Sequence, residues 1–213
     1  GVCFQWGSLI GISISSTYKT YTPAYNSTNP TASTWSSGAT SWGNFYITDS
    51  GSPYGQTSTY LNDVAQNEDV DYIAKKGDIC QYLSKTNAVS GSWRMPTAKE
   101  LNAGGVADDA YVAWTGSTAP WAKFGSFGSA SGSVDGQSTI FSGGIYTVNG
   151  SNSRFPASGC RNYSNYTLDN VGQGGYCWSS SACSGTYGFG LGFTSSQVYP
   201  AGDYYRQYGF PVR

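Results

Sequence analysis

Cysteines are the side chains in this sequence with the greatest capacity for covalent chemistry. The number is odd, so at least one thiol is free or is paired outside this segment. Cys177 and Cys183 are the closest in sequence, which fits a local disulfide or two neighbouring thiols. A nucleophilic thiol needs a nearby base or cation to lower its pKa, and neither cysteine has such a neighbour in the sequence. Catalysis at this pair is therefore not expected. The full set is Cys3, Cys80, Cys160, Cys177 and Cys183.

The sequence contains no histidine, which removes the commonest metal ligand and the commonest general base together. Calcium sites are built from clustered carboxylates, and residues 174–213 contain a single carboxylate, Asp203. A second acidic group, at Asp63, Glu68, Asp69 and Asp71, is interpreted as a solvated surface. We therefore expect no metal site, no cofactor and no enzymatic activity.

The composition is poor in charge and rich in aromatic residues. Charged residues make up 11% and aromatic residues 16% of the 213 positions. Disordered chains are poor in aromatics, so we expect one folded domain over residues 1–213 with a core rich in aromatic rings. The net charge of −1 and the lack of a basic stripe argue against nucleic acid as a partner. No apolar stretch is long enough to span a membrane, and the many Thr, Ser and Asn residues indicate an extracellular or cell-surface protein.

Residues 174–213 carry the strongest strand pattern in the chain. Phe189, Leu191 and Phe193 alternate with glycines, which predicts a strand with one filled face and one nearly bare face. Residues 198–203 contain Pro, Gly and Asp and are predicted to form a turn. The segment is thus expected to be a terminal β-hairpin. Its second strand would carry another alternating apolar row at Tyr208, Phe210 and Val212.

Outside these apolar rows, the predicted hairpin is dominated by Tyr, Ser and Gly. Antigen-binding loops use this mixture for rigid contact area and adaptable hydrogen bonds. So many tyrosines near one hairpin indicate a partner, and we predict recognition by shape, tyrosine contact area and backbone hydrogen bonding. Arg206 and Arg213 are expected to brace loops through backbone carbonyls, and contact with the ligand is the alternative. The residues expected to be exposed and to bind the ligand are Ala182, Cys183, Ser184, Gly185, Thr186, Tyr187, Gly190, Gly192, Tyr199, Ala201, Gly202, Asp203, Tyr204, Tyr205 and Tyr208.

Two regions carry helical signals, which place the chain in the α+β class. Residues 63–84 show apolar positions at helical spacing, and Gly77 interrupts them. Asp78 follows the interruption and can cap a second helical piece. Thr97 followed by Glu100 fits a capping box, which predicts that a short helix starts there.

Three short sequence motifs, in a fixed order, resemble those of a known family. They are residues 93–97 (WRMPT) with Glu100, residues 155–159 (FPASG), and residues 176–180 (YCWSS) with 208–213 (YGFPVR). Together they resemble the Fibrobacter succinogenes major paralogous domain, which is found in surface proteins of Bacteroidetes. The resemblance implies a C-type-lectin-like fold with two short helices, a small and mostly antiparallel sheet, long loops and central C-terminal strands.

The last segment also resembles the variable region of proteins diversified by diversity-generating retroelements, which share this fold. Between residues 176 and 208, only Trp178, Gln197 and Gln207 fall outside the residues encoded by NNY codons. The resemblance implies an adhesin-type or receptor-type domain, monomeric when isolated, that binds an unknown protein or glycan on another cell or host surface. The alternative location is a phage virion, in a receptor-binding protein.

Two other functions fit the same sequence. A structural subunit of a surface fibre or pilus would use the hairpin for assembly. Formylglycine-generating enzymes share the broad fold and use two C-terminal cysteines, which Cys177 and Cys183 resemble in position, but the lack of histidine argues against an oxidase. Calcium lectins of this superfamily use Glu-Pro-Asn or Gln-Pro-Asp with Trp-Asn-Asp, and these motifs are absent. The resemblance therefore implies calcium-independent binding.

Overall fold

The computed structural model describes residues 2–14, 19–23, 35–37, 43–47, 70–71, 75–86, 88–107, 110–114, 120–127, 140–148 and 150–212. Strands dominate these residues, and their ladders are antiparallel. Two short helices accompany them. The α+β class with a mostly antiparallel arrangement is confirmed, with a strong bias toward β-structure. Neither helix in the described residues has the length and apolar character needed to cross a membrane.

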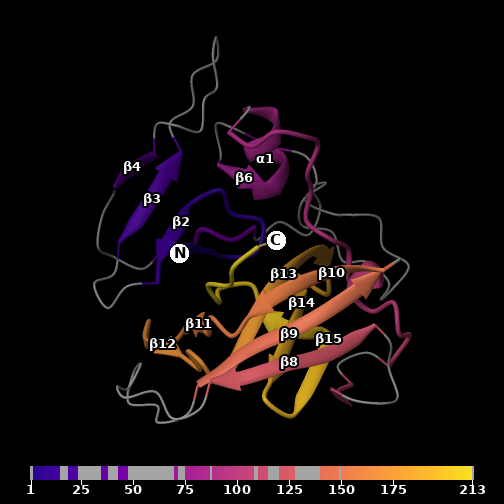
Figure 1. Cartoon of the computed structure of the whole chain (residues 1–213). Coiled ribbons are helices and arrows are strands. Elements are labelled where there is room, and N and C mark those ends of the chain that lie inside the picture. Colours follow the sequence, from indigo (N-terminus) through magenta and orange to yellow (C-terminus); the bar gives the residue numbers. More distant parts are fainter. Residues whose placement is uncertain are drawn as a thin grey trace.

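The C-terminal residues build the central sheet. Its strands are β13 (Gly174–Ala182), β14 (Tyr187–Thr194) and β15 (Gln197–Tyr205), which form an antiparallel meander. The short strand β7 (Val112–Ala113) pairs with β15 at the edge, so the sheet order is β13-β14-β15-β7. The segment is therefore a three-stranded meander that holds the centre of the fold (Figure 1).

The predicted turn at residues 198–203 is wrong, because these residues lie inside β15. The chain turns earlier, at residues 195–196, where β14 ends and β15 has not yet begun. The ladder register shifts between Gly190 and Gly192, so that Pro200 and Ala201 together lie opposite Leu191. A bulge of this kind tolerates a proline, which cannot donate a ladder hydrogen bond. Pro200 thus marks a bulge and not a turn.

Four further groups of strands accompany the central sheet in the described residues. β8 (Trp121–Phe127), β9 (Ile140–Val148) and β10 (Ser151–Pro156) form a sheet that crosses the central one in Figure 1. The N-terminal sheet contains β1 (Val2–Phe4), β2 (Gly11–Ser13), β3 (Thr20–Pro23) and β4 (Trp35–Ser37). Two small pairs complete the strands, β5 (Val70–Asp71) with β6 (Lys76–Gly77) and β11 (Cys160–Arg161) with β12 (Leu168–Asp169).

The apolar face of β14 packs as the alternation predicts. Leu191 and Phe193 lie in a buried cluster with aromatic residues of the β8–β10 sheet, among them Phe141. Phe189 packs against Ala98 of the second helix. All three β14 side chains are at most 1% exposed. This face therefore packs the central sheet against the β8–β10 sheet and against the second helix.

The glycine face of β14 is also covered, which corrects the expectation of a bare outer face. A Cβ atom at Gly188 would lie 2.5 Å from the indole of Trp6. A Cβ atom at Gly192 would lie 2.0 Å from the hydroxyl oxygen of Tyr204. Large aromatic rings occupy the space that the missing side chains leave, so the glycines serve packing and not display.

The two ends of the described chain meet beside this glycine face. Phe4 and Phe210 exchange backbone hydrogen bonds of 2.7 and 2.9 Å, and the indole N–H of Trp178 donates to the Phe4 carbonyl. Phe210 stacks on Trp178 with ring centroids 4.3 Å apart. The apolar row at Tyr208, Phe210 and Val212 therefore anchors the chain end and does not form the second strand of a hairpin.

The helices begin where capping signals occur. α1 (Ile79–Lys85) starts after Asp78, whose Oδ1 accepts hydrogen bonds from the N–H groups of Cys80 and Gln81. α2 (Ala98–Leu101) starts after Thr97, and both halves of the predicted capping box with Glu100 are present. The predicted helix over the first half of residues 63–84 is wrong at Val70–Asp71, which forms β5, and residues 63–69 and 72–74 lie outside the described residues. Ladder pairing with β6 overrides the helical spacing there.

Candidate functional site

Four tyrosines gather where β14 begins and β15 ends. Tyr187 and Tyr205 are direct ladder partners, and their ring centroids lie 4.6 Å apart. Tyr163, from the loop between β11 and β12, adds contacts of 4.8 Å to Tyr205 and 4.9 Å to Tyr208. All four side chains are half-buried. We call the set of Tyr163, Tyr187, Tyr205 and Tyr208 the tyrosine surface.

A hydrogen bond between two hydroxyl groups, as well as ring contacts, holds the tyrosine surface together. A hydrogen bond with the Tyr205 hydroxyl raises the pKa of Tyr187 to about 12. The Tyr187 hydroxyl therefore stays protonated at neutral pH and can donate or accept hydrogen bonds. The geometry gives a row of aromatic rings with hydroxyl groups at their edges, which suits contact with a partner.

Arg206 fixes the loop that leads into the tyrosine surface. Its guanidinium donates to the backbone carbonyls of Ser184, Tyr187 and Ile47, and lies 4.2 Å from the ring centroid of Trp6. Burial lowers the pKa of Arg206 to about 10, so the group remains charged at neutral pH. The prediction that Arg206 braces loops is confirmed, whereas Arg213 lies outside the described residues.

The predicted binding residues divide into three groups by exposure. Thr186 is exposed. The half-buried group consists of Cys183, Ser184, Gly185, Tyr187, Tyr199, Asp203, Tyr204, Tyr205 and Tyr208. The buried group consists of Ala182, Gly190, Gly192, Ala201 and Gly202, for which the expectation of exposure is wrong.

The buried group has two physical causes. Ala182 and Ala201 belong to hydrophobic clusters, where small side chains let neighbouring elements approach. Gly190, Gly192 and Gly202 all lie within contact distance of Tyr204, the ring that covers this part of the sheet. None of the five can present a side chain to a ligand.

Tyr199 lies apart from the tyrosine surface. It pairs with Gly192 near the turn between β14 and β15, and its ring lies 5.4 Å from that of Tyr111, which is 56% exposed. Tyr187 and Tyr205 lie at the opposite ends of the same two strands. The structure therefore divides the predicted tyrosines between two separate locations.

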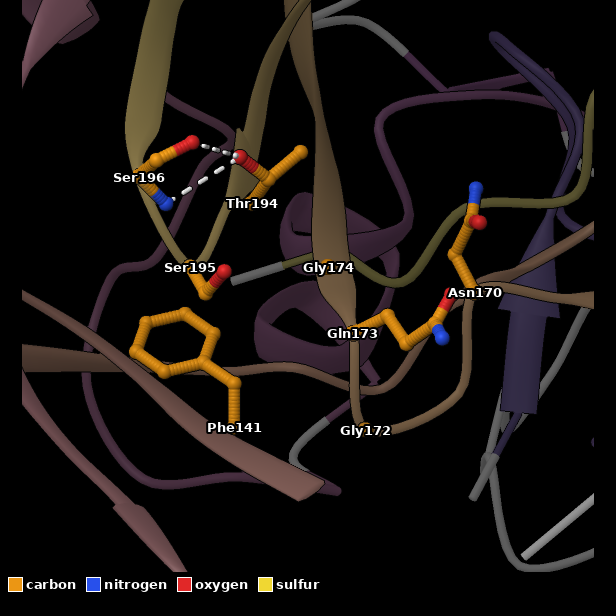
Figure 2. Close-up of a pocket in the computed structure, with 8 residues that line it drawn as sticks. All are labelled: Phe141, Asn170, Gly172, Gln173, Gly174, Thr194, Ser195 and Ser196. Atoms are coloured by element: carbon orange, nitrogen blue, oxygen red, sulfur yellow. Dashed lines mark hydrogen bonds between the residues drawn. The ribbon is translucent and has the colours of Figure 1, made fainter. Parts of the chain in front are cut away.

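A pocket of about 440 Å³ also lies at the turn end of the sheet. Residues 194–196 form one side, Asn170 and Gln173 come from the turn before β13, and Phe141 comes from β9 (Figure 2). The Thr194 hydroxyl accepts hydrogen bonds from the Ser196 and Gln197 N–H groups and thus fixes the turn. The lining residues carry no charge, so this pocket lacks a group for acid–base or metal chemistry.

The five cysteines form no disulfide, so Cys177 and Cys183 are not bonded to each other. Cys177 is buried and Cys183 is half-buried. Strand pairing brings the positive charge of Arg206 close enough to Cys183 to interact with it, which the sequence alone did not indicate. In the part of the chain that the structure describes, no group of three or more acidic, Cys or His side chains is arranged to hold a metal ion.

Sequence reasoning missed Tyr163, which joins the tyrosine surface from a separate loop. No local pattern marks it, because its partners are more than twenty positions away and only the fold brings them together. The sequence also does not reveal that the side chain of Trp93, in the segment before α2, is 60% exposed. Comparison with known proteins gives no further guidance, since no family model, curated protein or solved structure matches this chain.

Proposed function

We propose that this chain is a ligand-binding domain of the adhesin or receptor type, and that it binds through the tyrosine surface. The observation that carries the proposal is the run of ring contacts from Tyr187 through Tyr205 and Tyr163 to Tyr208. Rings that already pack on one another have little side-chain freedom left to lose when a partner binds. Tyrosine also supplies much of the binding energy at protein interfaces.

The scaffold beneath this surface supports the proposal. Arg206 ties residues 184–187 to the core, because it donates to the Ser184 and Tyr187 carbonyls and to the carbonyl of the buried Ile47. The Ser184 hydroxyl accepts hydrogen bonds from the N–H groups of Thr186 and Tyr187, which shapes the loop further. A binding surface on rigid elements keeps its geometry before it meets a ligand.

A C-type-lectin-like fold is part of the proposal. Two short capped helices, a central C-terminal meander and the pairing of Phe4 with Phe210 are compatible with that architecture. On this basis we place the domain outside the cell or on a cell surface, or on a phage virion. Its partner would be a protein or glycan on another cell.

Three of the five thiols are unsuited to catalysis. Burial raises the pKa of Cys3 and of Cys160 to about 12 and also raises the pKa of Cys80. A thiol must be deprotonated to act as a nucleophile. These three groups therefore stay in the inert form at physiological pH.

Sequence diversification, if it operates here, has defined positions available. Ser184, Thr186, Tyr187, Asp203 and Tyr205 are at least partly exposed, so their side chains can change without loss of the core. Sequencing the neighbouring DNA tests this part of the proposal. A near-repeat of the coding sequence beside a reverse transcriptase gene supports it, and isolates with identical sequences at these positions and no such repeat contradict it.

The binding proposal is tested with a fluorescently labelled domain applied to a panel of cultured bacterial and mammalian cells and to glycan and protein arrays. The variant Tyr163→Ser, Tyr187→Ser and Tyr205→Ser removes three of the four rings of the tyrosine surface. The matched control, Tyr111→Ser, removes a more exposed tyrosine that lies beside Tyr199, away from the tyrosine surface. We expect the first variant to lose binding and the control to retain it.

Thermal melting shows whether each variant is folded. A folded triple variant that binds as well as the wild type contradicts the proposal, as does a wild-type domain that binds nothing on the panel. The alternative of a fibre subunit is separated by sedimentation velocity. Concentration-dependent assembly that is lost in the triple variant favours the fibre, and a monomer at all concentrations contradicts it.

A further inference from the structure

Trp93 is an exposed tryptophan that the protein holds in one orientation. Its side chain is 60% exposed, whereas Trp6, Trp114, Trp121 and Trp178 are at most 4% exposed. A single exposed apolar side chain is common on protein surfaces. Trp93 is a candidate ligand contact because its large ring is held in place by hydrogen bonds and lines a cleft.

Hydrogen bonds fix both the backbone and the indole of Trp93. The backbone N–H donates to the Ser84 hydroxyl of α1 over 2.8 Å, and the indole N–H donates to the Ser90 carbonyl over 2.7 Å. Gly91 has a φ of 97° and lies against the same ring, where a Cβ atom would come within 3.1 Å of the indole nitrogen. Because its N–H is already engaged within the protein, the ring has only its apolar surface left to offer a ligand.

Trp93 borders an open cleft of about 500 Å³ between α1 and the segment before α2. Gln81 and Lys85 line it from the helix, and Ser92 and Arg94 line it from the segment beside Trp93. One flat apolar ring surrounded by amide, hydroxyl and cationic groups matches a ligand with an apolar face and polar edges. A pyranose ring has this character, since its axial C–H bonds form a weakly apolar face and its hydroxyls point outward.

The charge in the cleft narrows the ligand class. Arg94 forms a two-point ion pair with Glu100, at 2.8 and 2.6 Å, so its charge is already balanced. The exposed Lys85 side chain leaves one positive charge beside Trp93 in the cleft. A carboxylate on the ligand would complement this charge.

We propose that the Trp93 cleft binds a saccharide unit that carries a carboxylate, such as a uronic or sialic acid. The pyranose ring stacks on the indole, and the carboxylate pairs with Lys85. Gln81 and Ser92 accept or donate hydrogen bonds at the ring hydroxyls. This inference goes beyond the tyrosine surface, because the cleft is built from α1 and residues 91–94 and contains no residue of the C-terminal meander.

A peptide fits this cleft less well than a saccharide. Extended peptides commonly bind by adding a strand to an open sheet edge. The residues that line the cleft come from a helix and from a segment without strand structure, so no described strand edge borders it. Helical peptides need a groove lined by several apolar side chains, and Trp93 is the one large apolar side chain among the lining residues.

Isothermal titration calorimetry with three acidic oligosaccharides tests the proposal. The probes are a galacturonate oligomer, a hyaluronan fragment and sialyllactose, each paired with its carboxyl-reduced counterpart. We expect at least one acidic probe to bind, and its reduced counterpart to bind about tenfold more weakly. Added salt should weaken the acidic probe more than the reduced one, because ions screen the contact with Lys85.

Matched variants locate the site. Trp93→Ala should reduce affinity by at least about tenfold, and Trp93→Phe should restore part of it. Lys85→Gln should bring the acidic probe down to the affinity of its reduced counterpart. Lys19→Gln, which removes another exposed lysine, should leave affinity unchanged. Among the residues that the structure describes, the exposed indole donates to the Ser90 carbonyl alone, so the Trp93 variants are expected to melt near the wild-type temperature.

Three results would overturn the proposal. They are the absence of binding by all three acidic probes, equal affinity for the acidic and reduced forms, and unchanged affinity in a folded Trp93→Ala protein. Binding of a peptide library to the wild type that is lost in Trp93→Ala would assign the cleft to a protein partner and would also overturn it. Loss of cell binding in the tyrosine variant has no bearing on these results, so the two proposals fail independently.

Discussion

Tyr204 covers Gly192 so closely that a Cβ atom at Gly192 would lie 2.0 Å from the Tyr204 hydroxyl oxygen. The ring has little freedom to move away, because it also contacts Tyr176, Trp178 and Phe210 at centroid distances of 5.1–6.4 Å. The glycine on β14 and the tyrosine on β15 are therefore two halves of one packing contact. This contact seals the face of the central sheet that the sequence pattern leaves empty.

The first prediction follows from this contact. Gly192→Ala should destabilise the protein by about 1–3 kcal/mol, the usual effect of adding a methyl group to a closely packed site. The loss should be smaller when it is made in the Tyr204→Phe background, since the hydroxyl is the nearest atom. Chemical denaturation of the four proteins of this cycle measures the coupling. Equal losses in the two backgrounds would show that the hydroxyl does not oppose the added methyl group.

The second prediction contrasts Tyr204 with its neighbour Tyr205. Tyr204→Ser should reduce the free energy of unfolding by about 2 kcal/mol or more, because the ring fills space over the glycines. Tyr205→Ser should cost about 1 kcal/mol, the value of its ring pairs with Tyr163 and Tyr187. Thermal melting of the two variants checks this order. A reversed order would place Tyr205 in the core and remove it from the tyrosine surface.

Local signals predicted local structure well. The Thr97 and Glu100 spacing predicts the start of α2, and Asp78 predicts the start of α1, because a cap and the amides it binds are neighbours in sequence. The alternation at Phe189, Leu191 and Phe193 likewise predicts the buried face of β14. Each of these patterns depends on residues a few positions apart.

Features that depend on distant partners were not predictable from the sequence. The glycines of β14 predict a bare face, because the sequence does not show that Trp6 and Tyr204, from other parts of the chain, cover them. Pro200 reads as a turn residue until the ladder shows that it lies in a bulge. The candidate site was unpredictable for the same reason. The sequence does not reveal that the Tyr163 ring packs on Tyr205, nor that the Tyr204 ring packs on Tyr176 and away from Tyr205.

The third prediction concerns Asp78, a buried carboxylate that joins two elements. Its Oδ1 caps α1, and its Oδ2 accepts a 2.6 Å hydrogen bond from the Met95 N–H. Asp78→Asn keeps a good capping oxygen but points an amide N–H toward the Met95 N–H, which should cost about 1–3 kcal/mol. Asp78→Ala should cost about 1 kcal/mol more through loss of the cap. Denaturant unfolding at pH 7 compares them, and equal stability of wild type and Asp78→Asn would contradict the role of the Met95 contact.

The pH dependence of the Asp78 contribution has a defined sign. Burial raises the pKa of Asp78 from 3.8 to about 6, against the opposing effect of its backbone hydrogen bonds. The folded state thus binds the proton more tightly than the unfolded state. The part of the stability that depends on this proton is present below the unfolded pKa and is lost as pH rises through about 6, whereas the cap and the Met95 hydrogen bond still contribute at pH 7. The stability advantage of wild type over Asp78→Ala should therefore shrink between pH 4 and 6.

The fourth prediction concerns Glu100, whose pH dependence has the opposite sign. Hydrogen bonds from Arg94, together with those from the Thr97 N–H and hydroxyl, lower its pKa from 4.5 to about 2 despite partial burial. The unfolded state binds this proton more tightly, so the stabilisation is present above pH 4.5 and is lost as pH falls toward 2. The side chain is 49% exposed, and exposed ion pairs contribute about 0.2–1 kcal/mol, so the effect should be small.

Glu100→Gln tests this assignment, because glutamine can still accept the Thr97 N–H hydrogen bond but cannot form the ion pair with Arg94. Wild type should melt above Glu100→Gln at pH 6 and 0.02 M salt, and the difference should narrow as the pH is lowered below about 4. Added salt at pH 6 should narrow it as well, since ions screen an exposed pair. Lys99→Gln, next in the chain, is the control and should show neither trend. A difference that is constant from pH 6 to pH 2.5 would mean that the carboxylate charge does not hold Arg94, and that Glu100 acts through the capping box alone.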